Sequence, residues 1–191
     1  MADAPFDPSG AVTFDLSVGR VSLAHASARV LAPADGLTQL CEAAGEDATR
    51  TFGRAIGTSM GERVAQRVTE SGIESMTIEG YLEQVRGEFA IAGLGVVSIE
   101  RWGSALLFVV EHASVPLHLV AAVLDGALEA STGRKTMCAK LMESGERSRF
   151  LVTGQATAER VSAWLGEGVS WGEVIVKLHV GGDATKPRGE A

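Results

Sequence analysis

The segment Phe52-Gly-Arg-Ala-Ile-Gly-Thr-Ser-Met-Gly-Glu-Arg-Val-Ala-Gln-Arg-Val68 decides the fold class of this chain. Its apolar residues recur every four positions, and this spacing places them along one face of a helix. They are Phe52, Ile56, Met60, Val64 and Val68. The pattern predicts a long helix that begins after Gly45 and ends at about Thr69.

A second stripe of the same helix consists of glycines. Gly53, Gly57 and Gly61 also recur every four positions, and a glycine inside a helix costs about 1 kcal/mol relative to alanine. Close approach by the backbone of another element is the usual compensation for this cost. We therefore expect these glycines, with Arg54 beside them, to form a tight helix contact or a dimer interface.

The residues before this helix predict a leader and a hairpin. Proline, serine and glycine in residues 1–10 indicate a flexible leader. Residues 11–16 and 18–31 have the composition of two strands, although small residues interrupt the alternation of the second. A short helix is predicted over 37–44.

The residues after the long helix predict a helix and then a hairpin. Thr77 is a good N-cap for a helix over 78–91. Strands are expected over 95–101 and 104–113. The run from Ala105 to Val110 is continuously apolar, so we expect this strand to be central in its sheet and covered on both faces.

The last part of the domain continues with helices and a second hairpin. Pro116 favours a helix start, and a helix is predicted over 115–131. Strands are expected over 135–143 and 148–153, followed by helices over 157–166 and 171–179. The sequence Ser170-Trp-Gly-Glu173 fits a capping box at the start of the final helix.

These elements predict one α/β domain of the α+β type over residues 11–180. An antiparallel sheet made of hairpins is expected to pack against several helices. Residues 181–191 have the composition of a disordered tail.

Composition excludes several classes of protein. The net charge of -7 disfavours nucleic-acid binding, which needs clustered lysine and arginine. No apolar run approaches the roughly 18–20 residues of a membrane span, and Arg54 and Arg63 interrupt the long helix. Because the N-terminus also lacks the features of a signal peptide, a cytoplasmic location is expected.

Catalytic motifs are missing from the sequence. Gly93-Leu-Gly95 is half of a dinucleotide fingerprint, but it leads into a strand instead of a helix. His112 and Cys138 are the residues that an enzyme hypothesis would use as a base or a nucleophile, and neither lies in a recognisable signature. Trp102, on a predicted hairpin turn, is either a partner contact or a residue that folds back on its own sheet.

Two segments carry a resemblance to a known family. One is the helix of residues 52–68 with its spaced glycines, and the other is Val123–Arg134 followed by residues 136–152. The second segment contains a Gly-x-Leu-Glu-like run on a helix and then a hairpin with a glycine turn. Together with the order of elements, these two segments make residues 45–153 similar to the 4-vinyl reductase domain. Its wider superfamily includes one class of small subunits of the TRAPP vesicle-tethering complex.

This chain departs from the family pattern on the last hairpin. Many 4-vinyl reductase domains have one cysteine four residues before the turn glycine and another four residues after it. Around Gly145 those positions are Leu141 and Arg149, and Cys138 is out of register. The resemblance therefore implies a form without the metal site, and we carry over no metal ligand or cofactor.

The resemblance also implies a dimer, either of two identical chains or with a paralogous subunit, in which the long helices help form the interface. An apolar cavity between helices and sheet would hold a small hydrophobic ligand. Its candidate lining residues, for which plain core packing is the alternative role, are Met60, Leu82, Phe89, Leu107 and Val109.

The sequence thus favours a non-catalytic interaction module, acting as a dimeric adaptor or as a subunit of a larger assembly with an unidentified protein partner. The alternative is a sensor or carrier that binds a small hydrophobic ligand. A third hypothesis, an enzyme of tetrapyrrole metabolism, rests on the name of the family, and no catalytic residue supports it.

Overall fold

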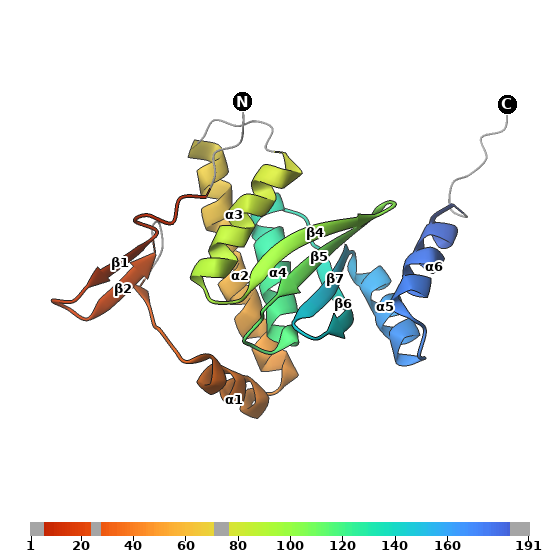
Figure 1. The fold of residues 1–191 in the computed structure, drawn as a ribbon, viewed down its shortest axis with the longest axis horizontal. Helices are drawn as coiled ribbons and strands as arrows, with labels where there is room; N and C mark the ends of the chain where they lie inside the picture. Colours follow the sequence, from red (N-terminus) through yellow and green to blue (C-terminus); the bar gives the residue numbers. More distant parts are fainter. Residues whose placement is uncertain (1–5, 24–27, 71–76, 184–191) are drawn as a thin grey trace.

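The computed structural model describes residues 6–23, 28–70 and 77–183. A four-stranded antiparallel sheet lies at the centre, with helices on both of its faces, and a three-stranded antiparallel sheet lies to one side (Figure 1). The predicted α+β class is confirmed, with two antiparallel sheets. The elements are β1 (Val12–Asp15), β2 (Arg20–Leu23), β3 (Ala28–Arg29), α1 (Ala34–Ala44), α2 (Glu46–Glu70), α3 (Ile78–Ile91), β4 (Val96–Trp102), β5 (Ala105–Glu111), α4 (Leu117–Thr132), β6 (Met137–Ser144), β7 (Arg147–Thr153), α5 (Gln155–Gly166) and α6 (Trp171–Asp183).

The central sheet has the strand order β4-β5-β7-β6, so two hairpins meet through their inner strands. Phe108 of β5 lies opposite Ile99 of β4 and Phe150 of β7. Residues 107–110 of β5 are all buried, which confirms the prediction of a central, doubly covered strand. A register shift between Lys140 and Met142 interrupts the pairing of β6 with β7.

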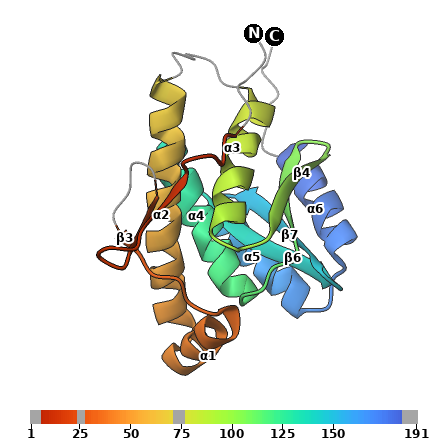
Figure 2. The same ribbon diagram turned by 60° about the vertical axis from the view of Figure 1, so that its left-hand side comes forward.

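The glycine stripe packs against another helix of the same chain. A Cβ on Gly57 would lie 2.0 Å from the carbonyl oxygen of Val123, and one on Gly61 would lie 2.3 Å from that of Ala127. These contacts advance in the same direction along α2 and α4, so the two helices run parallel and side by side (Figure 2). Gly126 on α4 approaches the backbone of α2 in return.

Of the two predicted uses of this stripe, the tight helix contact is therefore found and the dimer interface is corrected. The close contact that compensates for the glycines is made within one chain, and α4 occupies the edge that a second copy would need. Arg54 serves the same contact: it pairs with Glu129 of α4, and its Nη1 lies 3.8 Å from Oδ2 of Asp125.

The central sheet separates two apolar cores, one on each face. The larger core lies between the sheet and helices α2, α3 and α4, and contains Met60, Phe89 and Phe108. The smaller core lies between the sheet and helices α5 and α6, and contains Leu107 and Leu151. Figure 1 shows the two groups of helices on opposite sides of the sheet.

A buried ion-pair cluster joins α2 to α3 inside the larger layer. Arg63 donates through Nε and Nη2 to Oε2 of Glu88, at 3.0 and 2.5 Å, and Arg67 pairs with Oε1 of the same carboxylate at 2.5 Å. The side chains of Arg63 and Glu88 are 4% and 2% exposed. Phe6, from the predicted leader, lies against Arg67, with the guanidinium carbon 5.0 Å from the ring centroid.

Several local predictions are confirmed at helix ends. The side chain of Thr77 accepts a hydrogen bond from the backbone N–H of Gly80. The capping box is also present, because Glu173 accepts from the backbone N–H of Ser170 and donates its own N–H to the Ser170 hydroxyl. Both devices act within four residues, which is why sequence alone predicts them.

The two ends of the domain differ from the prediction. Residues 18–31 form β2 and β3, while residues 24–27 between them lie outside the described residues. Helix α6 continues to Asp183, past the predicted end at 179. Of the predicted leader and tail, residues 1–5 and 184–191 also lie outside the described residues. Within the described ranges, no helix has the length and apolar character of a bilayer span.

Candidate functional site

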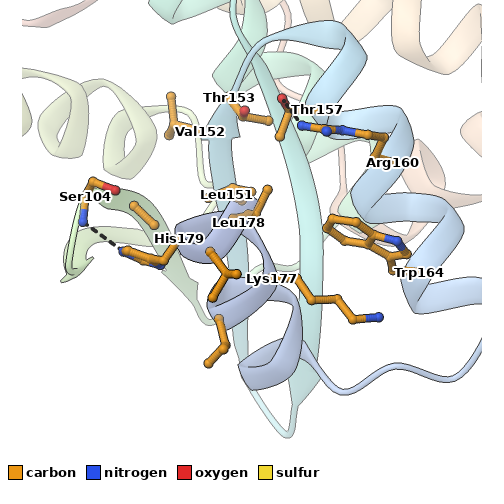
Figure 3. Close-up of a pocket in the computed structure, with 13 residues that line it drawn as sticks. Ser104, Leu151, Val152, Thr153, Thr157, Arg160, Trp164, Lys177, Leu178 and His179 are labelled. Atoms are coloured by element: carbon orange, nitrogen blue, oxygen red, sulfur yellow. Dashed lines mark hydrogen bonds between the residues drawn. The ribbon is translucent and has the colours of Figure 1, made fainter. Parts of the chain in front are cut away.

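A pocket of about 920 Å³ lies where α5 and α6 meet the start of strand β5 and the end of strand β7. Figure 3 shows its labelled lining residues, which come from the β4–β5 turn, from the end of β7 and from both helices. The lining residues are Ser104, Ala105, Leu151, Val152, Thr153, Thr157, Arg160, Trp164, Val176, Lys177, Leu178, His179 and Val180.

One part of the wall of this pocket is apolar. Leu151 is buried in the smaller core, and Trp164 and Leu178 pack against that core. Val176 and Val180 are 61% and 69% exposed, although both are large apolar residues. Exposed valines beside a tryptophan leave apolar surface for a ligand to cover.

Two cations flank the ring of Trp164. The guanidinium carbon of Arg160 lies 6.0 Å from the ring centroid, and Nζ of Lys177 lies 5.3 Å from it. Arg160 and Trp164 project from α5, whereas Lys177 projects from α6 (Figure 3). Arg160 also donates to the hydroxyl of Thr157 at 3.3 Å. The pocket thus combines an aromatic surface with two positive charges from different helices.

His179 fixes α6 to the β4–β5 turn at one end of the pocket. Its Nε2 accepts a hydrogen bond from the backbone N–H of Ser104 at 3.1 Å, and Nδ1 lies 2.7 Å from the carbonyl oxygen of Ile175. Because that carbonyl only accepts, Nδ1 carries the proton and Nε2 is free to accept. Gly103 has a φ of 60°, and a Cβ there would lie 2.2 Å from Nε2 of His179. The turn therefore needs glycine for both reasons.

Trp102 stands next to this region, at the end of β4. Its ring meets that of Trp171 edge to face, with centroids 5.2 Å apart, and its Nε1 donates to Oε2 of Glu100 at 3.2 Å. Trp102 therefore folds back on its own chain while 44% of it stays exposed. Its role as a partner contact stays a prediction.

An ion pair supports the same surface. Arg149 donates through Nε and Nη2 to the two oxygens of Glu100, at 2.9 and 3.0 Å, and its guanidinium carbon lies 5.4 Å from the centroid of Trp171. Hydrogen bonding by Arg149 is the main reason that the pKa of Glu100 is lowered.

The two positions that hold cysteines in many 4-vinyl reductase domains thus have other contacts here. Leu141 is buried in the smaller core, and Arg149 forms the ion pair with Glu100. Within the described residues, no group of three or more histidine, cysteine or acidic side chains is arranged to hold a metal ion.

A second pocket, of about 1090 Å³, lies between α4, β6 and α5, and includes Asp125 and Cys138. Oδ1 of Asp125 accepts the backbone N–H of Cys138 at 2.6 Å. Burial raises the pKa of the Asp125 carboxyl. Burial, with the adjacent carboxylate, raises the pKa of the Cys138 thiol well above its usual range. A thiol that stays protonated is a poor nucleophile, and Cys138 packs in the larger core.

The five predicted cavity residues do not line one cavity. Met60 and Phe89 are buried in the larger core, and Leu82 packs against it. Leu107 lies in the smaller core on the opposite face of the sheet, and Val109 shares that face by strand alternation. None of the five lines either of the two pockets described above. The structure thus gives these residues the alternative role, plain core packing. The apolar character of β5 alone does not say which face of the sheet each residue joins.

His112, the candidate base of the enzyme hypothesis, lies beside a carboxylate of the turn between β6 and β7. Its Nδ1 lies 2.6 Å from Oε2 of Glu146, and both side chains are well exposed. Glu111, its neighbour in sequence, pairs instead with Arg147. His112 does not line either pocket described above.

The residues of the first pocket were not among the predicted site residues. Helices α5 and α6 appeared in the sequence only as terminal helices. Two signals were present, however: Arg160 precedes Trp164 by four positions, which places both on one helix face, and Val176 and Val180 have the same spacing beside Lys177.

Comparison with known proteins gives a structural likeness. No protein-family model matches the chain, and no curated protein matches its sequence. Among solved structures, the chain is similar to the phenol-responsive sensory domain of the transcription activator PoxR with phenol. The TM-score is 0.61 and the identity 18%, over 83% of this chain and 92% of that chain. The chain shares the fold of this sensory domain. The resemblance to the 4-vinyl reductase domain stays a prediction.

Proposed function

We propose that this protein is a sensor or carrier that binds a small hydrophobic ligand in the pocket between α5, α6 and the central sheet. The observation that carries the proposal is a partly apolar pocket of about 920 Å³ with a tryptophan in its wall. Small-molecule sites are typically concave, mostly apolar and provided with a few polar groups. Thr153 and Thr157 are polar groups of this kind.

The structural neighbour supports the same proposal. It is described as a phenol-responsive sensory domain, and this chain spans nearly all of it. Because fold does not establish function, we base the proposal of ligand sensing in this chain on its pocket. The adaptor hypothesis has lost its candidate dimer interface, since α4 covers the glycine stripe of α2.

Filling the pocket tests the proposal. Thr157 on α5 lines the pocket, whereas the exposed neighbour Ala156 lines neither described pocket. We expect Thr157→Trp to weaken binding of naphthalene-2-carboxamide, a neutral apolar probe, by more than about tenfold, and Ala156→Trp to change it by less than about twofold. Isothermal titration calorimetry measures both, and circular dichroism checks that both variants are folded.

Two results would contradict the proposal. One is the absence of binding to the unmodified chain. The other is an equal affinity in Thr157→Trp and the unmodified chain, which would place the probe elsewhere. In the second case, loss of binding in Ser162→Trp would place the probe in the second pocket, which Ser162 lines.

A further inference from the structure

The charged residues around the proposed ligand pocket all have the same sign. Its lining includes Arg160 and Lys177 but no aspartate or glutamate. The protein as a whole carries a net charge of -7, so a pocket without an acidic residue is unlike the rest of the chain. A local excess of positive charge attracts anions and repels cations.

Neither cation forms a salt bridge within the described part of the chain, although Glu173, one turn before Lys177 on α6, interacts with Lys177 electrostatically. The ion pairs found there involve other side chains. Instead, Arg160 and Lys177 both lie near the ring of Trp164. A cation placed over an aromatic ring keeps donors free for a further partner, because the ring face uses none of its N–H groups in a conventional hydrogen bond.

The positions of these groups divide the pocket into an apolar part and a polar part. Leu151, Val176 and Leu178 supply apolar surface. The hydroxyl of Thr157 lies 3.3 Å from Nη2 of Arg160, so a hydroxyl and a guanidinium are available in one place. Arginine binds carboxylates through two parallel hydrogen bonds, and lysine acts on them as a point charge.

We infer that the ligand is an amphipathic carboxylate, with an aromatic or aliphatic body against the apolar wall and its carboxylate bound by the cations that flank the Trp164 ring, Arg160 and Lys177. This inference rests on the proposed function and names the chemical class of the ligand. A neutral ligand would make no charge-assisted contact with either cation, and a cationic ligand would be repelled by them.

A pair of probes with the same rings separates the two ideas. Naphthalene-2-carboxylate and naphthalene-2-carboxamide differ in charge but little in shape. We expect the full chain to bind the carboxylate about tenfold more tightly, as one charge-assisted contact would give. This preference should shrink as salt is raised, because both cations are exposed. Isothermal titration calorimetry at low and high salt measures it.

Matched variants locate the charge effect. In Arg160→Gln/Lys177→Gln the ratio of the two affinities should fall to about one, whatever the absolute Kd of the carboxamide. The control Arg86→Gln/Lys135→Gln removes two exposed cations that lie outside the pocket. It should keep the preference for the carboxylate.

The outcomes distinguish the two proposals. Equal binding of the two probes to the unmodified chain, with loss of both in Thr157→Trp, would overturn the carboxylate inference and leave the proposed function in place. A carboxylate preference that survives in Arg160→Gln/Lys177→Gln would also overturn it. If neither probe binds the unmodified chain, both proposals fail.

Discussion

Gly57 of α2 lies so close to Val123 of α4 that a Cβ on the glycine would be 2.0 Å from the carbonyl oxygen of the valine. No side chain larger than hydrogen fits there without moving a backbone. The backbones of helices α2 and α4 are therefore in direct contact, and the packing of the larger core depends on the short distance between the two helices.

Gly57→Ala should destabilise the protein by at least about 2 kcal/mol. The clash with a backbone atom outweighs the gain of about 1 kcal/mol that alanine brings to a helix. Gly172→Ala is the matched control, since a Cβ at that helical position meets nothing within 4 Å. Urea unfolding followed by circular dichroism measures both, and an unchanged midpoint for Gly57→Ala would refute the close contact.

Glu88→Gln should cost about 3 kcal/mol of unfolding free energy. The substitution leaves the guanidinium of Arg63, which is 4% exposed, without its counter-charge. Glu46→Gln is the control: it removes an exposed carboxylate from the pair with Arg50, and should cost less than about 1 kcal/mol. Equal effects of the two substitutions in urea unfolding would show that the buried pair contributes no more to the unfolding free energy than the exposed pair.

His179→Ala should loosen the turn that closes one end of the pocket. The variant loses the acceptor for the backbone N–H of Ser104. Because such a hydrogen bond contributes about 1 kcal/mol, exchange of that amide should accelerate about fivefold. Hydrogen exchange measured by NMR at constant pH checks this. His112→Ala, which removes an exposed pair with Glu146, should leave the Ser104 amide unchanged.

Asp125 should make the protein less stable as pH rises. Burial raises the pKa of its carboxyl in the folded state, so the folded state binds this proton more tightly than the unfolded state. The favourable contribution is complete below the unfolded pKa, which is about 3.9, and is lost as pH rises through the folded pKa.

Asp125→Asn removes this dependence and keeps an oxygen acceptor for the backbone N–H of Cys138. We expect the unfolding free energy of this variant minus that of the unmodified chain, measured in urea from about pH 4 to pH 7, to increase with pH. A difference between the two proteins that does not change with pH would mean that Asp125 does not titrate differently on folding.

Much of the fold follows from local patterns. The helix from Glu46 to Glu70 and the central strand with Leu107–Val110 lie where their apolar patterns predict. Thr77 caps its helix, and Ser170 with Glu173 forms the capping box. These features were predictable because side-chain periodicity and caps depend on residues only a few positions apart.

The candidate site was less predictable. Met60 and Leu107 were placed in one cavity, yet they lie on opposite faces of the sheet. Trp164 and Lys177 come from two helices that sequence patterns treat separately. Nζ of Lys177 comes within 5.3 Å of the Trp164 ring centroid only when both helices pack on the sheet. Long-range packing of this kind leaves no periodic signal in the chain.

By itself, then, the sequence determined the order of helices and strands, the close contact demanded by Gly53, Gly57 and Gly61, and the net negative charge. Only the tertiary structure decided that α4 of the same chain meets those glycines, and that Arg160 and Lys177 face one apolar pocket. The physical reason is range: backbone propensity, capping and amphipathic spacing act over a few residues, whereas partner choice and pocket formation depend on side chains that are distant in sequence and compete for the same surfaces.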